Sequence, residues 1–409
     1  MEEVIVCGPQ PLQHQVNPLD LLNAMTNSDR DFDIVLQGAT GFTGGLAARD
    51  LIARAPDGLR VAVAGRNEAK VAALAEELGV PGVVADGLDA KATAALAART
   101  RVVLSCAGPF ALYGDRLVAS CAQAGTHYAD LTGELPWLAR IIERHHEACT
   151  KSGTTLVPCS GFDSVPTDIA VHSMAAELDR LGRTPSRIRG FFRIRGGLNG
   201  GTLHSGLALG ESGEMAFQSP DQDAAPSAGH EPEPTVFPIP SQKRWAAPFL
   251  MAPVNEWITR RSSALLGEIG EAYPFRYTEH LSERRWHRAK LMSGLLTLSG
   301  VMLTSSAGRS LLRTFGPKPG QGPSEKSIAG GFARLILIAG DLDEPTMTRQ
   351  WNWSGDPSNL ITIRCLVQTG LALANGEAKR GGVLTPVAAL GSKLKLRLLE
   401  SGAVTTSGE

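Results

Sequence analysis

Three glycines near the N-terminus are spaced as a phosphate-binding loop would require. Gly38, Gly41 and Gly44 follow an apolar stretch at 33–37 and precede a helical pattern. Glycine lets the backbone turn tightly and approach a pyrophosphate, and the free N–H groups of the following helix then face the anion. The spacing alone is also compatible with an ordinary glycine-rich turn. The loop that these three glycines would form also contains Thr40, Phe42 and Thr43.

A second short strand is expected at 59–64, and it ends at Gly65, Arg66 and Asn67, with Lys70 one turn into the next helical pattern. A dinucleotide's adenosine ribose lies at this end of the second strand, where NAD sites carry an acidic residue. Arg66 offers positive charge instead, which favours the 2′-phosphate of NADP(H) over NAD(H). The alternative is that Arg66 is an ordinary solvated cation.

A third buried strand is expected over 101–107, and it stops at Gly108 and Pro109 because proline cannot donate to a strand ladder. Carboxyl ends of parallel strands line the ligand crevice of such sheets, so this end should border the nicotinamide half of the cofactor. The residues expected there are Ser105, Cys106, Ala107, Gly108, Pro109 and Phe110. Cys106 is better explained as a small crevice wall than as a nucleophile, since nothing nearby in the sequence would lower its pKa.

Alternating strand and helix patterns from 31 to 185 predict an α/β domain, a Rossmann-like doubly wound parallel sheet. Residues 1–30 lack a signal-peptide pattern and are expected to be a loosely ordered extension. The chain has 409 residues and a net charge of −1, with no basic and aromatic cluster, which excludes nucleic acid as an expected partner. Its six scattered cysteines predict neither a metal site nor disulfides, and a cytoplasmic location follows.

Five motifs in register extend this interpretation: GATGFTG at 38–44, AGRN at 64–67, CAGPFALYG at 106–114, YADLTGE at 128–134 and GFDSVPTD at 161–168. Together they resemble the saccharopine dehydrogenase-like NADP-binding family, within it the branch of trans-acting enoyl reductases and saccharopine dehydrogenase-like oxidoreductases. The resemblance covers about 31–210. It implies that the glycine loop holds the diphosphate of NADP(H) and Arg66 the adenosine phosphate.

The same resemblance implies a second α+β domain on a mixed sheet over 186–365, with helices of 366–409 packing back on the nucleotide domain. A loop rich in proline and acidic residues at 218–240 is expected to be mobile within it. Residues 291–308 carry no charge and lie between basic segments. They contain too much glycine, serine and threonine to be expected as a membrane-spanning helix. They could contact a membrane surface, line an acyl tunnel, or form core or a homodimer contact.

The chemistry expected of a bound NADP(H) is hydride transfer, most plausibly to the carbon–carbon double bond of a hydrophobic substrate such as an acyl thioester. The candidate proton donors are Tyr128, Ser164 and His204, although His204 could be a solvated helix residue. Thr132 and Glu134 could instead only cap the helix that follows them. The alternatives are a saccharopine-type amino-acid dehydrogenase, using Arg193 and Arg195 on substrate carboxylates, or a non-catalytic NADP-binding protein at a lipid surface.

Overall fold

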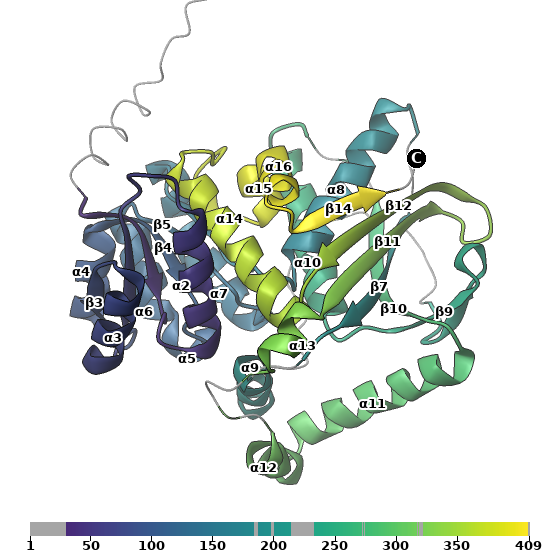
Figure 1. Ribbon diagram of the computed structural model, residues 1–409. Coiled ribbons are helices and arrows are strands. Elements are labelled where there is room, and N and C mark those ends of the chain that lie inside the picture. The colour runs from purple at the N-terminus through teal and green to yellow at the C-terminus, as the bar shows by residue number, and fades with distance from the viewer. Residues whose placement is uncertain are drawn as a thin grey trace, which may run out of the picture.

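The computed structural model describes residues 30–183, 187–197, 200–213, 233–271, 273, 275–316, 318 and 322–407. Two seven-stranded sheets lie side by side with a layer of helices between them (Figure 1). The expected N-terminal extension falls outside the described residues except for Arg30, as do residues 218–232 of the expected loop. Both sheets were expected from the sequence, and the α/β fold class is confirmed.

The first sheet is entirely parallel, with the order β13-β6-β5-β4-β1-β2-β3. From β1 the chain adds β2 and β3 on one side and then β4, β5 and β6 on the other side. The strand order therefore reverses between β1 and β4. Every residue of β1 is buried, as expected for a parallel strand covered by helices on both faces. The strands are β1 Phe32–Gln37, β2 Val61–Gly65, β3 Gly82–Val84, β4 Thr100–Ser105, β5 His127–Asp130, β6 Thr155–Val157 and β13 Gly382–Val383.

Helices follow most of these strands, so the chain alternates as the sequence pattern predicts. The first of them, α2, starts at the glycine loop and buries its alanines and Leu51 against the sheet. The helices are α2 Phe42–Arg54, α3 Glu68–Leu78, α4 Ala90–Ala98, α5 Phe110–Tyr113, α6 Asp115–Ala124 and α7 Leu135–Ser152.

The second sheet is mixed, with the order β14-β12-β11-β7-β10-β9-β8. Only β7 and β10 pair in parallel among its described strands. Alternate residues face opposite sides, so Phe192 joins the main core while Phe191 joins a smaller apolar cluster. The strands are β7 Arg187–Arg195, β8 Phe237–Ile239, β9 Arg244–Pro248, β10 Arg276–Glu283, β11 Phe332–Gly340, β12 Pro345–Ser354 and β14 Val404–Ser407. The loop prediction was therefore wrong for residues 237–239, because apolar Phe237 and Ile239 are buried in this sheet.

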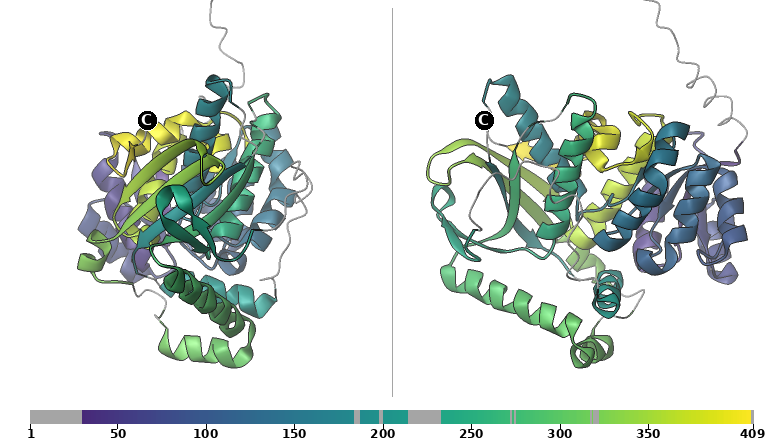
Figure 2. Two further views of the ribbon diagram at one scale, coloured as in Figure 1. Left: turned by 90° about the vertical axis from the view of Figure 1, so that its right-hand side faces the viewer. Right: turned by 180° about the vertical axis from the view of Figure 1, so that it is seen from behind.

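The layer between the sheets contains one continuous apolar core that reaches both of them (Figure 2). Helix α14 packs on β4 and α2, and the short strand β13 near the C-terminus completes the first sheet. Residues 386–400 form two helices rather than one, because Gly391 has a φ of +57° that interrupts the helix. The elements are α8 Val165–Arg180, α10 Ala252–Gly267, η4 Pro357–Ile361, α14 Thr362–Ala374, α15 Pro386–Leu390 and α16 Ser392–Glu400.

Three helices lie together at one end of the molecule, outside this layered body (Figure 1). These are α9 Gly200–Ser212, α11 Trp286–Thr304 and α12 Ser306–Phe315; the short η3 Pro240–Gln242 and α13 Glu325–Ala329 lie elsewhere. Among the described helices none is by itself long and apolar enough to span a membrane, and α11 and α12 meet at a bend of 103°. The core alternative for residues 291–308 was wrong, because α11 and α12 bury only Ala289.

Candidate functional site

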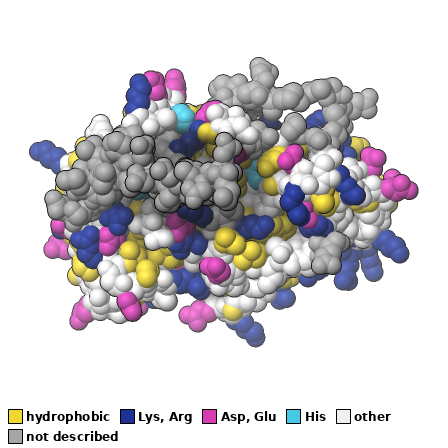
Figure 3. Space-filling model, turned by 90° about the horizontal axis from the view of Figure 1, so that it is seen from above, with side chains coloured by type: hydrophobic (Ala, Val, Ile, Leu, Met, Phe, Trp, Pro, Cys, Tyr) yellow, Lys and Arg dark blue, Asp and Glu magenta, His cyan; other side chains and the backbone are white. Residues whose placement is uncertain are grey.

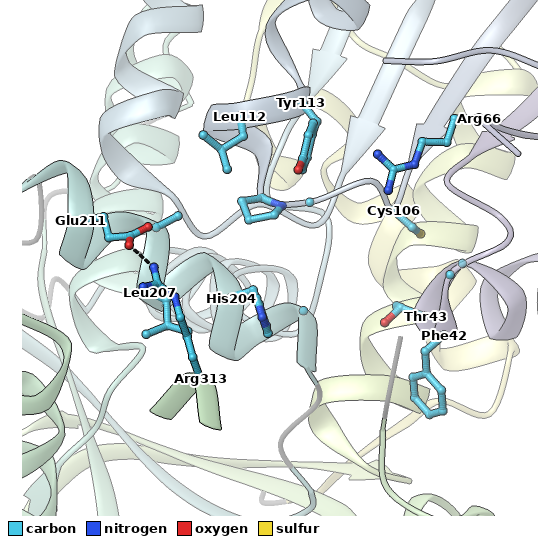
Figure 4. Close-up of a pocket in the computed structure, with 16 residues that line it drawn as sticks. Phe42, Thr43, Arg66, Cys106, Leu112, Tyr113, His204, Leu207, Glu211 and Arg313 are labelled. Carbon is cyan, nitrogen blue, oxygen red and sulfur yellow. Dashed lines mark hydrogen bonds and ion pairs between the residues drawn. The ribbon is translucent and has the colours of Figure 1, made fainter. Parts of the chain in front are cut away.

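A cavity of ≈ 400 Å³ opens at the carboxyl ends of β1, β2 and β4 (Figure 4). It lies where the strand order of the parallel sheet reverses, the place where open α/β sheets bind ligands. Helix α9 closes the opposite side. The lining residues are Gly41, Phe42, Thr43, Gly44, Arg66, Cys106, Gly108, Pro109, Leu112, Tyr113, Gly201, His204, Leu207, Ala208, Glu211 and Arg313.

The glycine loop forms the wall of this cavity after β1. Gly38 has a φ of +79°, which favours glycine, and a Cβ on Gly44 would lie 2.1 Å from the Gly38 carbonyl oxygen. Gly41 is the N-cap of α2, and no side chain caps that helix. The first N–H groups of a helix have no partner within it, so the α2 N-terminus offers donors for an anion. Gly38 does not line the cavity; it shapes the turn.

Arg66 lies on the same side of the cavity, directly after β2. It is exposed, and it forms no ion pair with the other residues that the structure describes. Asn67 instead caps helix α3 by accepting from the Lys70 backbone N–H at 3.0 Å. Gly65 packs against the Thr40 side chain. Of the four candidates at this turn, Arg66 lines the cavity, whereas Gly65, Asn67 and Lys70 do not.

The loop after β4 provides a third wall. Cys106, Gly108 and Pro109 line the cavity, while Ser105 is buried beneath it. Burial raises the pKa of the Cys106 thiol to about 12, so at neutral pH it is an uncharged wall residue. Two further residues of the predicted nicotinamide side, Ala107 and Phe110, do not line the cavity; the backbone at Ala107 instead packs close to Gly38.

Glu134 is a buried carboxylate that joins two walls of the cavity. It accepts from the backbone N–H groups of Phe110 at 2.9 Å and Ala111 at 2.8 Å, and from the Ser205 hydroxyl at 2.9 Å. Its side chain does not cap its own helix α7, so the expectation that it might do so was wrong. Glu134 instead fixes the loop after β4 against helix α9. This contact with Ser205 could not be predicted from the sequence, because the two residues are 71 positions apart.

The structure does not bring Tyr128 to the cavity. Its side chain is fully buried, and its hydroxyl donates to the Asp130 carboxylate at 2.8 Å. Asp130 also accepts from the backbone N–H groups of Thr132 at 2.9 Å and Cys159 at 3.1 Å. Burial raises the pKa of Asp130 to about 7. This network ties the ends of β5 and β6 together behind the cavity wall.

Ser164 is also fully buried and does not line the cavity. It is the N-cap residue of α8, as its sequence context predicts, but its hydroxyl does not cap the helix. Asp168 accepts from the Val387 backbone N–H at 2.9 Å, which joins α8 to α15. Asp168 was expected to be structural, and this contact gives it that role. Burial raises the pKa of the neighbouring Asp163 carboxyl to about 6.

His204 is the one candidate proton donor of the three that lines the cavity (Figure 4). Its Nδ1 lies 2.8 Å from the Gly200 carbonyl oxygen. A carbonyl only accepts, so Nδ1 carries a proton and Nε2 is the nitrogen left to exchange one with a ligand. Residues 201, 204, 207, 208 and 211 repeat with the period of a helix, so one face of α9 forms this wall.

Charge in the cavity is sparse. Glu211 forms an ion pair with Arg313 of α12, so Arg66 is the lining cation without such a partner among the described residues (Figure 4). Arg193 and Arg195 lie on β7 and do not line the cavity. The remaining wall is largely apolar, including Leu112 and Leu207. The lining residues that were not predicted from the sequence are Leu112, Tyr113, Gly201, Leu207, Ala208, Glu211 and Arg313.

Comparisons with known proteins agree with this geometry. Residues 34–157 match the family model for the saccharopine dehydrogenase NADP-binding domain. A provisionally named trans-acting enoyl reductase of Mycobacterium tuberculosis is 36% identical over 92% of this chain and 98% of its own length. The trans-acting enoyl reductase of Mycobacterium ulcerans is 33% identical over 94% of this chain and 99% of its own length.

Solved structures show the same fold at low identity. Saccharopine dehydrogenase (L-Glu forming) of Saccharomyces cerevisiae has a TM-score of 0.56 at 14% identity, covering 92% of this chain and 99% of its own. Homospermidine synthase of Legionella pneumophila, solved with NAD, has a TM-score of 0.50 at 10% identity, covering 94% and 93%. The arrangement of a parallel dinucleotide-type sheet beside a mixed sheet is therefore shared by proteins of widely different sequence.

Proposed function

This chain belongs to the trans-acting enoyl reductase family of saccharopine dehydrogenase-like proteins, and from that premise we propose that it reduces the carbon–carbon double bond of a hydrophobic acyl thioester. It is an NADP(H)-dependent oxidoreductase. The observation that supports the finer proposal is the cavity, where the helix N-terminus and Arg66 face a wall of apolar side chains.

The residues present fit NADP(H). The uncapped N-terminus of α2 would hold the diphosphate through the N–H groups of Phe42, Thr43 and Gly44. Arg66 would bind the 2′-phosphate, because it reaches the cavity and has no ion-pair partner among the described residues. Cys106, Gly108 and Pro109 would border the nicotinamide side. When bound, NADPH supplies the hydride for the β-carbon of the substrate.

The substrate class follows from what else lines the cavity. An amino-acid dehydrogenase of the saccharopine type needs cations to grip substrate carboxylates. Here the guanidinium of Arg313 is already paired with Glu211, and Arg66 is assigned to the nucleotide. Leu112 and Leu207 offer apolar surface instead. An acyl chain without charge suits this wall better than a dicarboxylate does.

We propose that His204 supplies the proton that the α-carbon requires. It lies on α9, on the cavity wall opposite the α2 N-terminus, and its Nδ1 is held by the Gly200 carbonyl. Protonated at Nε2, the imidazolium would donate to the substrate and leave the ring neutral, so charge and proton balance. Ser205 and Glu134 hold the helix that carries it, and therefore act as positioning residues.

The test is NADPH consumption by the purified full chain with trans-2-enoyl thioesters of increasing acyl length, compared with the keto acid and amino acid pairs that form saccharopine-type imines. We expect turnover with the enoyl thioesters and a fall in KM as the chain lengthens. Turnover only with the imine-forming pairs would establish the amino-acid dehydrogenase instead. Tight retention of NADPH with no turnover of either class would support the non-catalytic alternative.

A further inference from the structure

Helix α11 exposes large apolar side chains along one face. Leu291, Leu295, Leu298 and Val301 are 58%, 49%, 55% and 57% exposed. Their spacing of four, three and three residues places them on one side of the helix, and about half of each side chain remains exposed. The outer face of a helix in a globular protein is normally polar, so a continuous apolar stripe of this kind marks a contact surface.

Helix α12 continues this surface beyond the 103° bend. Leu311 is 50% exposed and Phe315 is 81% exposed, the largest value among the exposed large apolar side chains. Both helices lie at the outer edge of the molecule, where α11 packs beside β9 at the edge of the second sheet (Figure 2). We call the apolar residues of the two helices, Leu291, Leu295, Leu298, Val301, Leu311 and Phe315, the α11–α12 face.

The segment that carries the α11–α12 face has charges of one sign, although Arg313 within it pairs with Glu211 of α9. Residues 284–324 contain no Asp or Glu but seven Lys and Arg, whereas the whole chain has a net charge of −1. Arg285 and Arg288 are exposed at the N-terminal end of α11, beside Trp286, which is 51% exposed with the Lys290 ammonium over its ring. The opposite side of the molecule, seen in Figure 3, carries acidic and basic side chains interspersed. The positive charge is therefore concentrated at the α11–α12 face.

We propose that the α11–α12 face docks on the surface of an anionic lipid bilayer. An apolar stripe flanked by cations and a tryptophan is the pattern of helices that lie in the interface of a membrane. The bend excludes a single continuous span across the bilayer, so the pair would lie on the membrane rather than cross it. Anionic headgroups would neutralise the Arg and Lys side chains at the rim.

A second copy of the chain fits this face less well. In a twofold dimer the same patch meets itself, so the cations around one α11 would approach those around the other. The segment offers no carboxylate to offset this repulsion. The positive potential extends to the second sheet, where burial lowers the pKa of Arg193, and nearby Arg334 and Arg284 lower it further. A negatively charged partner is favoured at this end of the molecule.

The other side of this helix pair contacts the helix that closes the cavity. A Cβ on Gly210 of α9 would lie 2.1 Å from the Leu303 carbonyl oxygen, and Arg309 donates to the Gly210 carbonyl oxygen at 3.2 Å. Arg313 pairs with Glu211, which lines the cavity. Docking would thus place the α9 wall next to the bilayer. The inference that a lipid-borne substrate reaches the cavity by this route rests on the proposed function. The docking proposal itself does not.

The experiment is cosedimentation of the full chain with vesicles of phosphatidylcholine alone or mixed with phosphatidylglycerol. We expect binding to the anionic vesicles that weakens as salt is added. The double variant Leu295→Glu, Leu298→Glu should lose binding by at least about tenfold. Leu396→Glu is the matched control, since Leu396 is 54% exposed on α16, and it should bind as the native protein does. Arg285→Gln and Arg288→Gln should each weaken anionic binding about fivefold.

Absence of vesicle binding by the native chain, or equal binding by the Leu295→Glu, Leu298→Glu variant, would overturn the proposal. A native dimer that this variant converts to a monomer in analytical ultracentrifugation would identify a second copy as the occupant and would overturn it as well. Turnover of a soluble short-chain enoyl thioester without vesicles should be unchanged in the variant. If the native chain does not turn over this thioester, the result counts against the proposed function. The docking proposal is then still tested by vesicle binding.

Discussion

The Glu134 carboxylate accepts from the Ser205 hydroxyl at 2.9 Å and thereby joins the parallel-sheet domain to helix α9. The same Oε1 atom accepts from the Phe110 N–H, and Oε2 accepts from the Ala111 N–H. One buried side chain thus fixes the loop after β4 and the opposite helix relative to each other. Glu134 thus links two elements that contribute walls of the cavity.

Glu134→Ala should therefore both destabilise the protein and weaken NADPH binding. The substitution leaves two buried N–H groups and one hydroxyl without their acceptor, and we expect the free energy of unfolding to fall by about 2–4 kcal/mol. Ser205→Ala removes one of the three contacts and should cost about 1 kcal/mol. Urea unfolding and the KM for NADPH measure the two effects. Equal effects of the two substitutions would contradict the bridging role of Glu134.

The two neighbouring glycines of α2 should respond differently to alanine. A Cβ on Gly44 would lie 2.1 Å from the Gly38 carbonyl oxygen, so Gly44→Ala must displace the backbone of the turn. We expect a loss of about 1–3 kcal/mol in unfolding free energy and a marked loss of NADPH affinity. Gly45→Ala is the control, because a Cβ there meets only the flexible end of Arg49 at 3.2 Å and the Ala39 carbonyl oxygen at 3.6 Å.

Gly45→Ala should leave NADPH affinity unchanged and can raise stability by up to about 1 kcal/mol through helix propensity. Thermal unfolding and titration with NADPH are the measurements for both variants. Similar losses in Gly44→Ala and Gly45→Ala would show that the close approach of Gly44 to Gly38 is not what the turn requires.

The glycine loop and Arg66 could be predicted from the sequence because their roles depend on local order. A strand, three glycines and a helix form one continuous unit, and the next strand ends at Arg66. Both reach the cavity as predicted. Tyr128 and Ser164 do not, because a position near a strand end does not fix which way a side chain points. Each is fully buried, and neither lines the cavity.

The wall formed by α9 could have been predicted from helical periodicity. Steps of three and four residues from His204 lead to Leu207, Ala208 and Glu211, which line the cavity on the same face of the helix. Arg313 had no such signal, because its contact with Glu211 joins residues 102 apart in the sequence. The strand β13 could also not be predicted from the sequence, because its two residues, Gly382 and Val383, are too few to show a periodicity.

Burial of Asp130 predicts a pH dependence of stability. Burial raises its pKa from an ordinary value of 3.8 to about 7, so the folded protein retains this proton where the unfolded chain has lost it. Between about pH 4 and 7 the native state binds more protons than the unfolded state, and stability from this group falls as pH rises. Over this pH range the native chain should lose on the order of 2–4 kcal/mol more unfolding free energy than Asp130→Asn does.

Urea unfolding at pH 5 and pH 8 measures this difference, because the pH 5 state retains the Asp130 proton and the pH 8 state has lost most of it. The exposed Asp57→Asn is the control and should show the same pH dependence as the native protein. If Asp130→Asn lost as much stability between the two pH values as the native chain does, Asp130 would be ionised in the fold throughout.

His204→Gln should lower kcat by about 10²–10⁴-fold while the Kd for NADPH stays within a few fold, because the ring is assigned to proton delivery rather than cofactor binding. Ser205→Ala, one residue away, should lower kcat far less, because it leaves the imidazole in place. A kcat that His204→Gln leaves unchanged would exclude His204 as the donor.

The most direct measurement is the Kd for NADPH and for NADH of the native chain and of Arg66→Ala. We predict that the native chain prefers NADPH and that Arg66→Ala weakens NADPH by about 10- to 100-fold with little change for NADH. Lys70→Ala should have a smaller effect, since Lys70 does not line the cavity. Equal loss for both nucleotides in Arg66→Ala, or no affinity of the native chain for NADPH, would contradict the account.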